Sequence, residues 1–110
     1  MSRTPSELLQ GTVDVLILRT LAWGPMHGYA ISRWIRERSG DRLAIEGAAL
    51  YQALHRLRHQ GLITSEWGTS ENNRRARFYR LNTAGEVRLR AQAASWRSYS
   101  AAVTRVLGAV

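Results

Sequence analysis

The sequence contains no cysteine and no lysine, and it has no apolar stretch long enough to cross a membrane. Without cysteine, disulfides and thiolate metal sites are excluded, which agrees with a reducing compartment. The longest apolar run, Val15–Trp23, is interrupted by Arg19 and Thr20 and is far shorter than the ~20 residues of a membrane helix. The polar residues 1–7 form no secretion signal. We therefore expect a cytoplasmic protein with no membrane partner.

Acidic residues are scarce as well. Eight acidic against sixteen basic side chains give a formal net charge of +8, which favours polyanionic partners. All sixteen basic side chains are arginine, and the guanidinium group binds phosphates and guanine edges in a bidentate manner. A G+C-rich genome explains the absence of lysine equally well, so that both explanations of the arginine bias remain open.

The residue groups that enzymes need are also missing. The sequence has no glycine-rich phosphate loop, no Ser-His-Asp pattern with supporting context and no pair of carboxylates on one helix face. His55 and His59 have a spacing compatible with zinc, but no third ligand is evident near them. We expect neither an enzyme nor a cofactor or metal site, and we interpret both histidines as exposed side chains of a surface that meets a polyanionic partner.

The length of 110 residues and the hydrophobic content of 45% fit a small globular protein. Hydrophobic periodicity and chain-breaking residues predict a mostly α fold with a small β-hairpin. The expected helices are Thr12–Ala22, His27–Gly40, Ala48–Gln60 and Thr83–Leu107, and the expected strands are Ile63–Trp67 and Ala76–Leu81. Leu43–Ile45 is a candidate third strand, and Thr83 with Glu86 forms a candidate capping box.

The segment from residue 48 to residue 81 combines an amphipathic helix with a basic hairpin. Leu50, Leu54 and Leu57 form the buried stripe of the helix, so that other side chains point outward. Such a helix enters the major groove, while a basic hairpin tip reaches phosphates or the minor groove. Gln52 suits adenine, and Ala49 suits a thymine methyl group. The expected DNA-binding residues are Ala49, Tyr51, Gln52, His55, Arg56, Asn73, Arg74, Arg75 and Arg77.

The last helix carries an apolar seam. Apolar residues recur along it with a 4-3 rhythm and one polar member, Gln92, as in helices that pair with a second copy. The helix at Thr12–Ala22 is apolar nearly all round and also needs two covers. The expected homodimer contacts, which also form the candidate pocket for a planar or apolar effector, are Val15, Leu18, Leu89, Trp96, Tyr99, Val103 and Val106. We expect residues 1–81 to bind DNA and residues 82–110 to form the dimerisation helix.

An ordered set of motifs extends along nearly the whole chain, from Leu9 to about Leu107. It consists of Leu9–Leu18, Gly24–Tyr29, Leu50–Tyr51, Ala53–Leu57, Gly61–Ile63, Trp67–Gly68, and Glu71–Ala76 before Phe78–Tyr79. This set resembles the PadR family of winged helix-turn-helix transcriptional regulators. The stretch at residues 71–76 is similar to the short, acidobacterial-type branch of that family.

The resemblance implies a homodimeric repressor that binds inverted repeats in promoters, often its own, and that dimerises through a single C-terminal helix together with the first helix. It also implies that Tyr51 is the recognition-helix tyrosine and that Arg74, Arg75 and Arg77 belong to the wing. The chain departs from the family pattern where Ala48–Ala49 replace the common Gly-Ser or Gly-Thr, and where Gln52 replaces the common proline. Loss of the hydroxyl removes a helix cap or a phosphate contact, so these departures bear on which operator is read.

Two other functions remain open. The departures at Ala48, Ala49 and Gln52 are the reason for one alternative, a ligand-sensing or interaction module on the same fold with weak or relaxed DNA binding. The other is a basic RNA-binding protein. Readers of single-stranded RNA usually present aromatic side chains on a sheet face that is wider than one hairpin.

Overall fold

The computed structural model describes residues 5–110 and contains, over that range, four helices and a three-stranded antiparallel sheet. The elements in chain order are α1 (Pro5–Trp23), β1 (Met26–His27), α2 (Gly28–Arg38), α3 (Gly47–His59), β2 (Ile63–Thr69), β3 (Arg75–Leu81) and α4 (Thr83–Leu107). Residues 1–4, part of the stretch in which no secretion signal is expected, lie outside the described residues. The expected fold class, mostly helical with a small hairpin, is confirmed.

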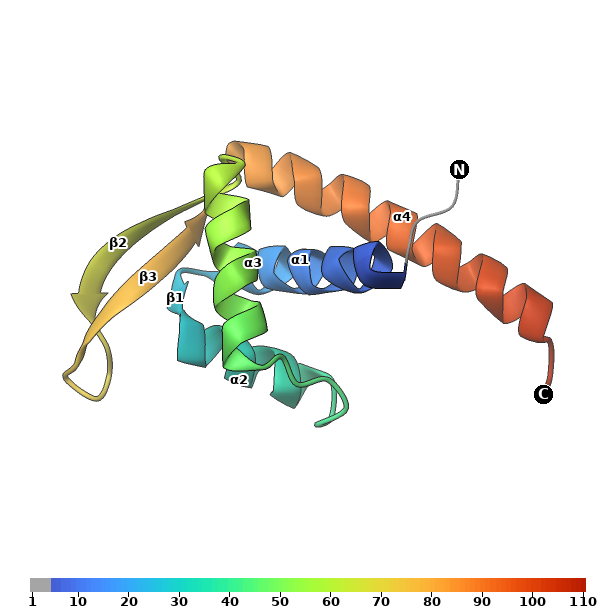
Figure 1. The fold of residues 1–110 in the computed structure, drawn as a ribbon, viewed down its shortest axis with the longest axis horizontal. Coiled ribbons are helices and arrows are strands. Elements are labelled where there is room, and N and C mark those ends of the chain that lie inside the picture. The colour runs from blue at the N-terminus through green and yellow to red at the C-terminus, as the bar shows by residue number, and fades with distance from the viewer. Residues whose placement is uncertain (1–4) are drawn as a thin grey trace.

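α1 is the central helix of the fold. It contacts α2, α3, α4 and β3, and Figure 1 shows it passing behind α3 and alongside the first half of α4. The core lies where these helices meet the base of the hairpin and consists of Ile17, Leu18, Leu21, Ile31, Ile35, Leu50, Ala53, Leu54, Leu57, Leu62, Ile63 and Tyr79. α1 begins at Pro5 rather than near Thr12, since proline is well suited to the first position of a helix.

The third strand of the sheet is β1, and the expectation of a strand at Leu43–Ile45 is wrong. β1 pairs with β3 through Met26 and Tyr79 and through His27 and Phe78, which gives the strand order β1-β3-β2. Leu43 instead lies in the loop before α3, where its N–H donates to the Ser39 hydroxyl at 2.9 Å. The β-propensity of this stretch has no effect because no strand edge lies beside it.

The start of α4 is fixed by Asn82, and the expected Thr83–Glu86 capping box is wrong. The Asn82 side-chain oxygen accepts a hydrogen bond from the Gly85 N–H at 2.8 Å, and its amide nitrogen donates to the Gly61 carbonyl at 2.8 Å. Asn82 is therefore the N-cap, and Thr83 becomes the first residue of the helix. The cap also connects α4 to the turn between α3 and β2.

α4 extends well beyond the body formed by α1, α2 and α3 (Figure 1). Its second half, from Trp96 onward, consists mostly of exposed residues. No helix among the described residues is both long enough and apolar enough to span a membrane.

Candidate nucleic-acid interface

The outward face of α3 carries polar and aromatic side chains. Tyr51 is 55% exposed, and Ala49, Gln52 and His55 are exposed around it. Glu46 occupies the N-cap position, but its side chain makes no capping hydrogen bond. The structure thus presents these four predicted residues of α3 to solvent.

Tyr51 packs on Gly28, a residue that the sequence reasoning did not select. A Cβ at Gly28 would lie 2.6 Å from Tyr51 Oη and 2.9 Å from Tyr51 Cζ, which is closer than non-bonded atoms approach. The absence of a side chain at Gly28 therefore allows the Tyr51 ring to lie against α2. His27 precedes it as the N-cap of α2, its Nδ1 accepting from the Ala30 N–H at 3.3 Å. A glycine at the first position of a helix was the sequence feature that pointed to such a close approach.

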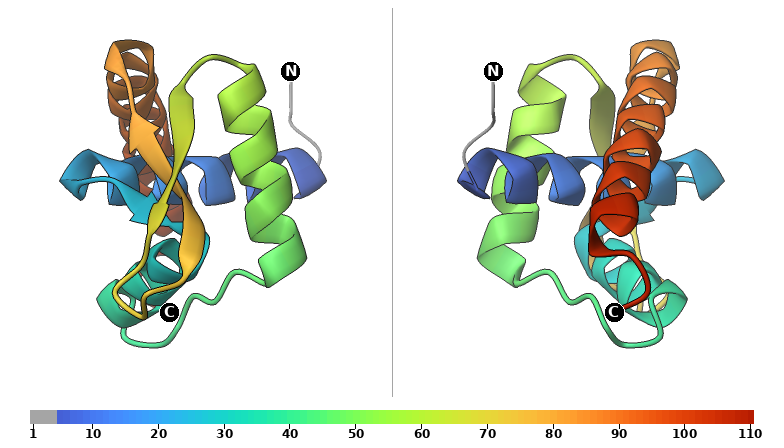
Figure 2. Two further views of the ribbon diagram at one scale, coloured as in Figure 1. Left: turned by 90° about the vertical axis from the view of Figure 1, so that its left-hand side faces the viewer. Right: turned by 90° about the vertical axis from the view of Figure 1, so that its right-hand side faces the viewer.

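The hairpin presents arginine on the face that adjoins α3. Strand register places Trp67 opposite Arg77, and Thr69 opposite Arg75, so that these side chains share one face of the sheet. Arg74 and Asn73 are exposed at the turn, where Asn73 has a φ of 58°. Figure 2, left, shows α3 and the hairpin side by side, so the structure brings the two predicted groups of residues together.

Tyr79 connects the hairpin with α3. Its side chain is 8% exposed, and burial raises the pKa of Tyr79 above its ordinary value, while the positive charges of Arg77 and Arg58 act in the opposite direction. Tyr51 acts with burial to raise it. Arg58, which is exposed on α3, therefore lies close to this junction and adds a cation that was not among the predicted DNA-binding residues.

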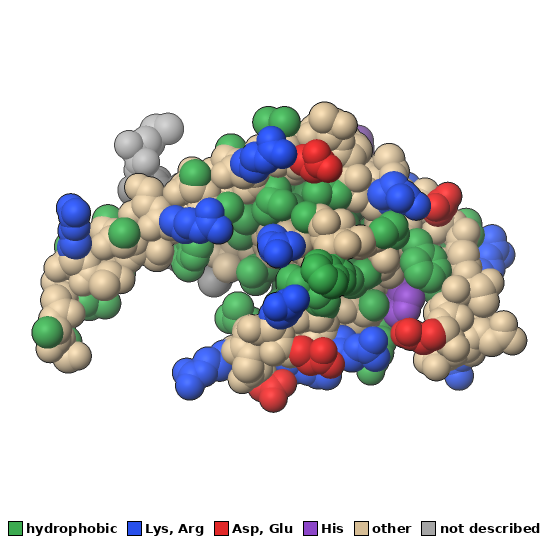
Figure 3. Space-filling model, turned by 180° about the vertical axis from the view of Figure 1, so that it is seen from behind, with side chains coloured by type: hydrophobic (Ala, Val, Ile, Leu, Met, Phe, Trp, Pro, Cys, Tyr) green, Lys and Arg blue, Asp and Glu red, His purple; other side chains and the backbone are tan. Residues whose placement is uncertain are grey.

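The acidic side chains of the hairpin are turned away from this face. Glu66 pairs with Arg80 at 3.7 Å, and Glu71 lies 3.8 Å from Arg33 and 4.0 Å from His27 of the α2 side. Figure 3, which views the molecule from behind, shows acidic side chains beside arginines on that opposite side. The charged side chains on the α3-facing side of the hairpin are therefore arginines.

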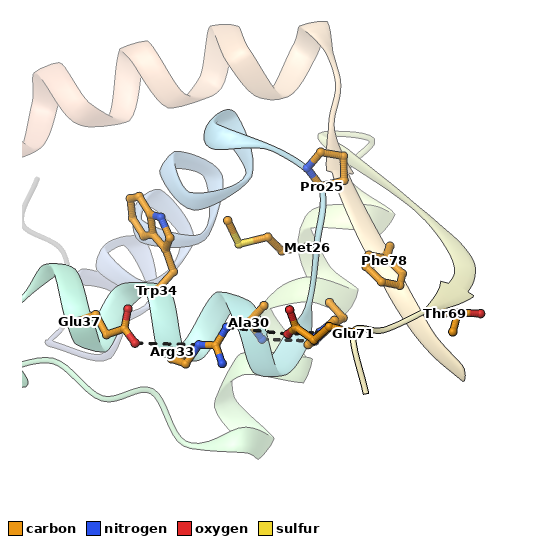
Figure 4. A pocket seen from close by; sticks show the side chains of 10 residues that line it. Pro25, Met26, Ala30, Arg33, Trp34, Glu37, Thr69, Glu71 and Phe78 are labelled. Carbon is orange, nitrogen blue, oxygen red and sulfur yellow. Dashed lines mark hydrogen bonds and ion pairs between the residues drawn. The ribbon is translucent and has the colours of Figure 1, made fainter. Parts of the chain in front are cut away.

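A hollow of about 310 Å³ lies between α2 and the hairpin, on the side away from α3. Figure 4 shows Met26, Trp34 and Phe78 around it and Arg33 between Glu37 and Glu71. These ion pairs are solvent-exposed, and such pairs contribute little to stability. The Arg33–Glu71 pair lies where the hairpin turn meets α2.

Arg56, which was expected among the DNA-binding residues, is directed toward α1 rather than to the outward face of α3. Arg56 Nη2 lies 2.5 Å from Asp14 Oδ1 of α1. Asp14 is 8% exposed, and Arg56 Nε is buried without a hydrogen-bond partner. A charge buried in this way needs its partner, so Arg56 joins α3 to α1. The sequence feature that could have indicated this role was the acidic residue Asp14 among the apolar residues of α1.

The predicted dimer residues fall into two groups. Trp96, Tyr99, Val103 and Val106 are 47%, 48%, 39% and 87% exposed on the second half of α4. Leu18 is completely buried within the single chain, and its assignment to the dimer interface is wrong because other elements of its own subunit cover α1. Among the remaining two, Val15 is partly buried, and Leu89 packs against the core of the same chain.

The two histidines of α3 lie on its exposed surface. The rings of His55 and His59 stack with centroids 6.4 Å apart. Among the described residues, no three His, Cys, Asp or Glu side chains are grouped so that they could hold a metal ion. Both imidazoles instead extend the polar surface of α3.

The sequence of this chain matches a known protein family. The profile of the transcriptional regulator PadR-like family matches residues 17–91, which contain all of α2, α3 and the hairpin. The chain belongs to the PadR-like family. Members of this family are DNA-binding transcription regulators rather than enzymes, so this PadR-like chain is a DNA-binding transcription regulator.

Solved structures and one curated protein are similar to this PadR-like chain. A transcriptional regulator from Clostridium thermocellum is 28% identical, with a TM-score of 0.82 over 93% of this chain and 99% of that one. A PadR family transcriptional regulator from Eggerthella lenta is 31% identical, with a TM-score of 0.76 over 94% and 88% of the two chains. An uncharacterized protein of Lysinibacillus sphaericus is 28% identical over 91 residues, which is 83% of this chain and 84% of that protein.

Proposed function

We propose that this PadR-like regulator is a homodimeric repressor that binds an inverted-repeat operator in promoter DNA in the cytoplasm. Residues 1–81 form the DNA-binding domain, and residues 82–110 form the dimerisation helix. The observation that carries the proposal is the joint surface of α3 and the hairpin, on which Tyr51 is 55% exposed and Arg75 and Arg77 of β3 lie nearby. In this arrangement α3 enters the major groove while the hairpin follows the phosphates.

Eight of the predicted DNA-binding residues have a role in this proposal. Gln52 pairs with an adenine edge, and Ala49 touches a thymine methyl group. Tyr51 and His55 contact bases or the adjoining sugar-phosphate backbone. The wing residues that contact phosphates, independently of sequence, are Asn73, Arg74, Arg75 and Arg77.

The second half of α4 supplies the contact between subunits. Four large apolar side chains on it are exposed in the single chain, namely Trp96, Tyr99, Val103 and Val106. A seam of this kind is covered by the same helix of a second copy. Two subunits joined in this way place their α3 helices in half-sites about 34–36 Å apart, one turn of DNA.

The effector site, in the same proposal, lies between the subunits at Trp96 and Tyr99. Their rings are 6.0 Å apart and inclined at 36°, and both are about half exposed. A planar or apolar molecule placed between these aromatic side chains and those of the partner changes the spacing of the two α3 helices, and it releases DNA if the new spacing no longer fits.

The test is fluorescence anisotropy with labelled DNA from upstream of the regulator's own gene, titrated with salt. Binding is expected to weaken steeply with salt. Arg75→Ala should weaken binding to every sequence and reduce the salt slope by about 1, whereas Gln52→Ala should change the preference among sequences. The proposed surface is wrong if both variants bind all duplexes like the parent. Quenching of tryptophan fluorescence by planar compounds, together with no measurable DNA binding, would favour the ligand-sensing alternative instead.

A further inference from the structure

Trp67 lies at the centre of the arginine face of the wing and is not part of the hydrophobic core. It is 55% exposed, although tryptophan is normally well buried. Register places Ser65, Trp67 and Thr69 directly opposite Tyr79, Arg77 and Arg75. Trp67 therefore has an arginine beside it and another diagonal to it on the same face.

Both arginines lie against the indole ring. The guanidinium carbon of Arg75 is 4.4 Å from the ring centroid of Trp67, and that of Arg77 is 5.4 Å from it. Both distances are within the range of a cation–π interaction, for which tryptophan is the best acceptor. A second contact orders Arg77, because its Nε–H also donates a hydrogen bond to the Ser65 hydroxyl at 2.9 Å. These contacts leave the Nη groups of Arg77 available to another acceptor.

An arginine side chain that is already ordered in the unbound protein binds its ligand more tightly. A mobile arginine side chain loses rotamer freedom when it binds a phosphate, and this loss reduces affinity. Contacts that order the side chain in the unbound protein reduce the loss on binding. The indole ring orders two arginines at once.

We propose that Trp67 is a positioning residue for DNA binding, which holds Arg75 and Arg77 toward adjacent phosphates before the duplex arrives. The inference rests on the proposed function, because it assumes that this face of the wing meets DNA. Trp67 acts through the two arginines rather than through a contact of its own with DNA. Glu66 and Glu71, which face the other side of the hairpin, do not compete for these guanidinium groups.

The experiment compares Trp67→Leu with Trp67→Phe in the full-length protein, in the parent background and in an Arg75→Ala/Arg77→Ala background. Trp67→Leu keeps an apolar side chain but removes the ring, and it should weaken DNA binding by about five- to thirtyfold, because two arginine side chains then lose their rotamer freedom only on binding. Trp67→Phe should recover most of the affinity. In the double-alanine background Trp67→Leu should cause no further loss, because the residues through which Trp67 acts are gone.

Arg80→Ala is the matched control. Arg80 lies on the same strand and carries the same charge, but it pairs with Glu66 on the other face. Its removal in the Trp67→Leu background should add its own small effect without coupling to Trp67. Unfolding curves of each variant show whether a loss of binding reflects a loss of folded protein.

The contacts are also tested without DNA, by NMR of the arginine side chains. The Nε–H resonances of Arg75 and Arg77 in the parent should be shifted by the indole ring, and Trp67→Leu should move both but leave Arg80 unchanged. Parent-like affinity of Trp67→Leu overturns the inference, as does a full loss that persists in the double-alanine background. If the parent binds no duplex, the proposed function fails, and unchanged arginine resonances in Trp67→Leu would then overturn the arginine contacts separately.

Discussion

Arg56 and Arg75 have the same side chain but opposite environments. Arg75 is exposed on the wing, whereas Arg56 is bound to Asp14, which is 8% exposed. Arg56→Met leaves the Asp14 carboxylate buried without its partner, which should lower the free energy of unfolding by about 2–4 kcal/mol. Urea denaturation monitored by circular dichroism measures this change.

The matched control for this prediction is the double variant Asp14→Leu/Arg56→Met. It removes both charges and should return the unfolding free energy to within about 1 kcal/mol of the parent. A single Arg56→Met variant with parent-like stability and a large loss of DNA affinity would instead restore Arg56 to the DNA-binding surface.

Gly28 affects DNA binding through the position of the Tyr51 side chain. In Gly28→Ala the new Cβ would lie 2.6 Å from Tyr51 Oη, and the flexible tyrosine is the group that moves. Stability should change by less than about 1 kcal/mol, because alanine is favoured over glycine in a helix. DNA affinity should fall about tenfold as Tyr51 leaves its position. Thermal unfolding and anisotropy measure the two effects separately.

Gly24→Ala provides the comparison, since nothing lies within 4 Å of a Cβ at that position. Its DNA affinity should match that of the parent. Equal affinities for Gly24→Ala and Gly28→Ala would show that the position of Tyr51 does not affect binding.

At the scale of elements, the first turn of α4 is fixed against the hairpin by Gly85. A Cβ there would collide with the Leu62 carbonyl oxygen and with the Leu81 side chain, and the backbone oxygen cannot move without disturbing β2. Gly85→Ala should therefore lower the unfolding free energy by about 2–3 kcal/mol. Gly47→Ala, in the first turn of α3, meets no atom within 4 Å and should stabilise the protein by up to about 1 kcal/mol. Denaturant titration measures the unfolding free energy of both variants. Equal changes in the two would contradict the close contact of Gly85 with the hairpin.

The helices were largely predictable from sequence because their stripes are strongly periodic. Leu50, Leu54 and Leu57 are buried as predicted, and the outward residues of α3 follow from the same spacing. The third strand was not predictable, since Met26–His27 is only two residues long and exists because β3 lies beside it. Short strands depend on their pairing partner more than on their own residues.

At the scale of the whole molecule, α4 joins the DNA-binding surface of one subunit to that of the other in the proposed dimer. Val103→Glu places a charge on the seam, where Val103 is 39% exposed, and burying an unpaired charge between helices is costly. The variant should sediment as a monomer at concentrations at which the parent is a dimer. Its affinity for a full inverted repeat should fall at least about a hundredfold, because two linked sites bind more tightly than one.

Ala101→Glu is the control for the seam, because Ala101 is exposed on α4 and lies outside the 4-3 pattern. It should leave both the dimer and its DNA affinity unchanged. Parent-like sedimentation of Val103→Glu would remove α4 from the interface.

The sequence by itself determined the helical stripes, the basic hairpin and the absence of cysteine chemistry, because composition and periodicity are local properties of the chain. Only the tertiary structure decided that Arg56 binds Asp14, that Leu18 is covered by its own subunit and that Trp67 lies against Arg75 and Arg77. These are contacts between residues distant in sequence or across a strand pair. Their distances depend on how the elements pack, which the spacing of residues within one element does not specify.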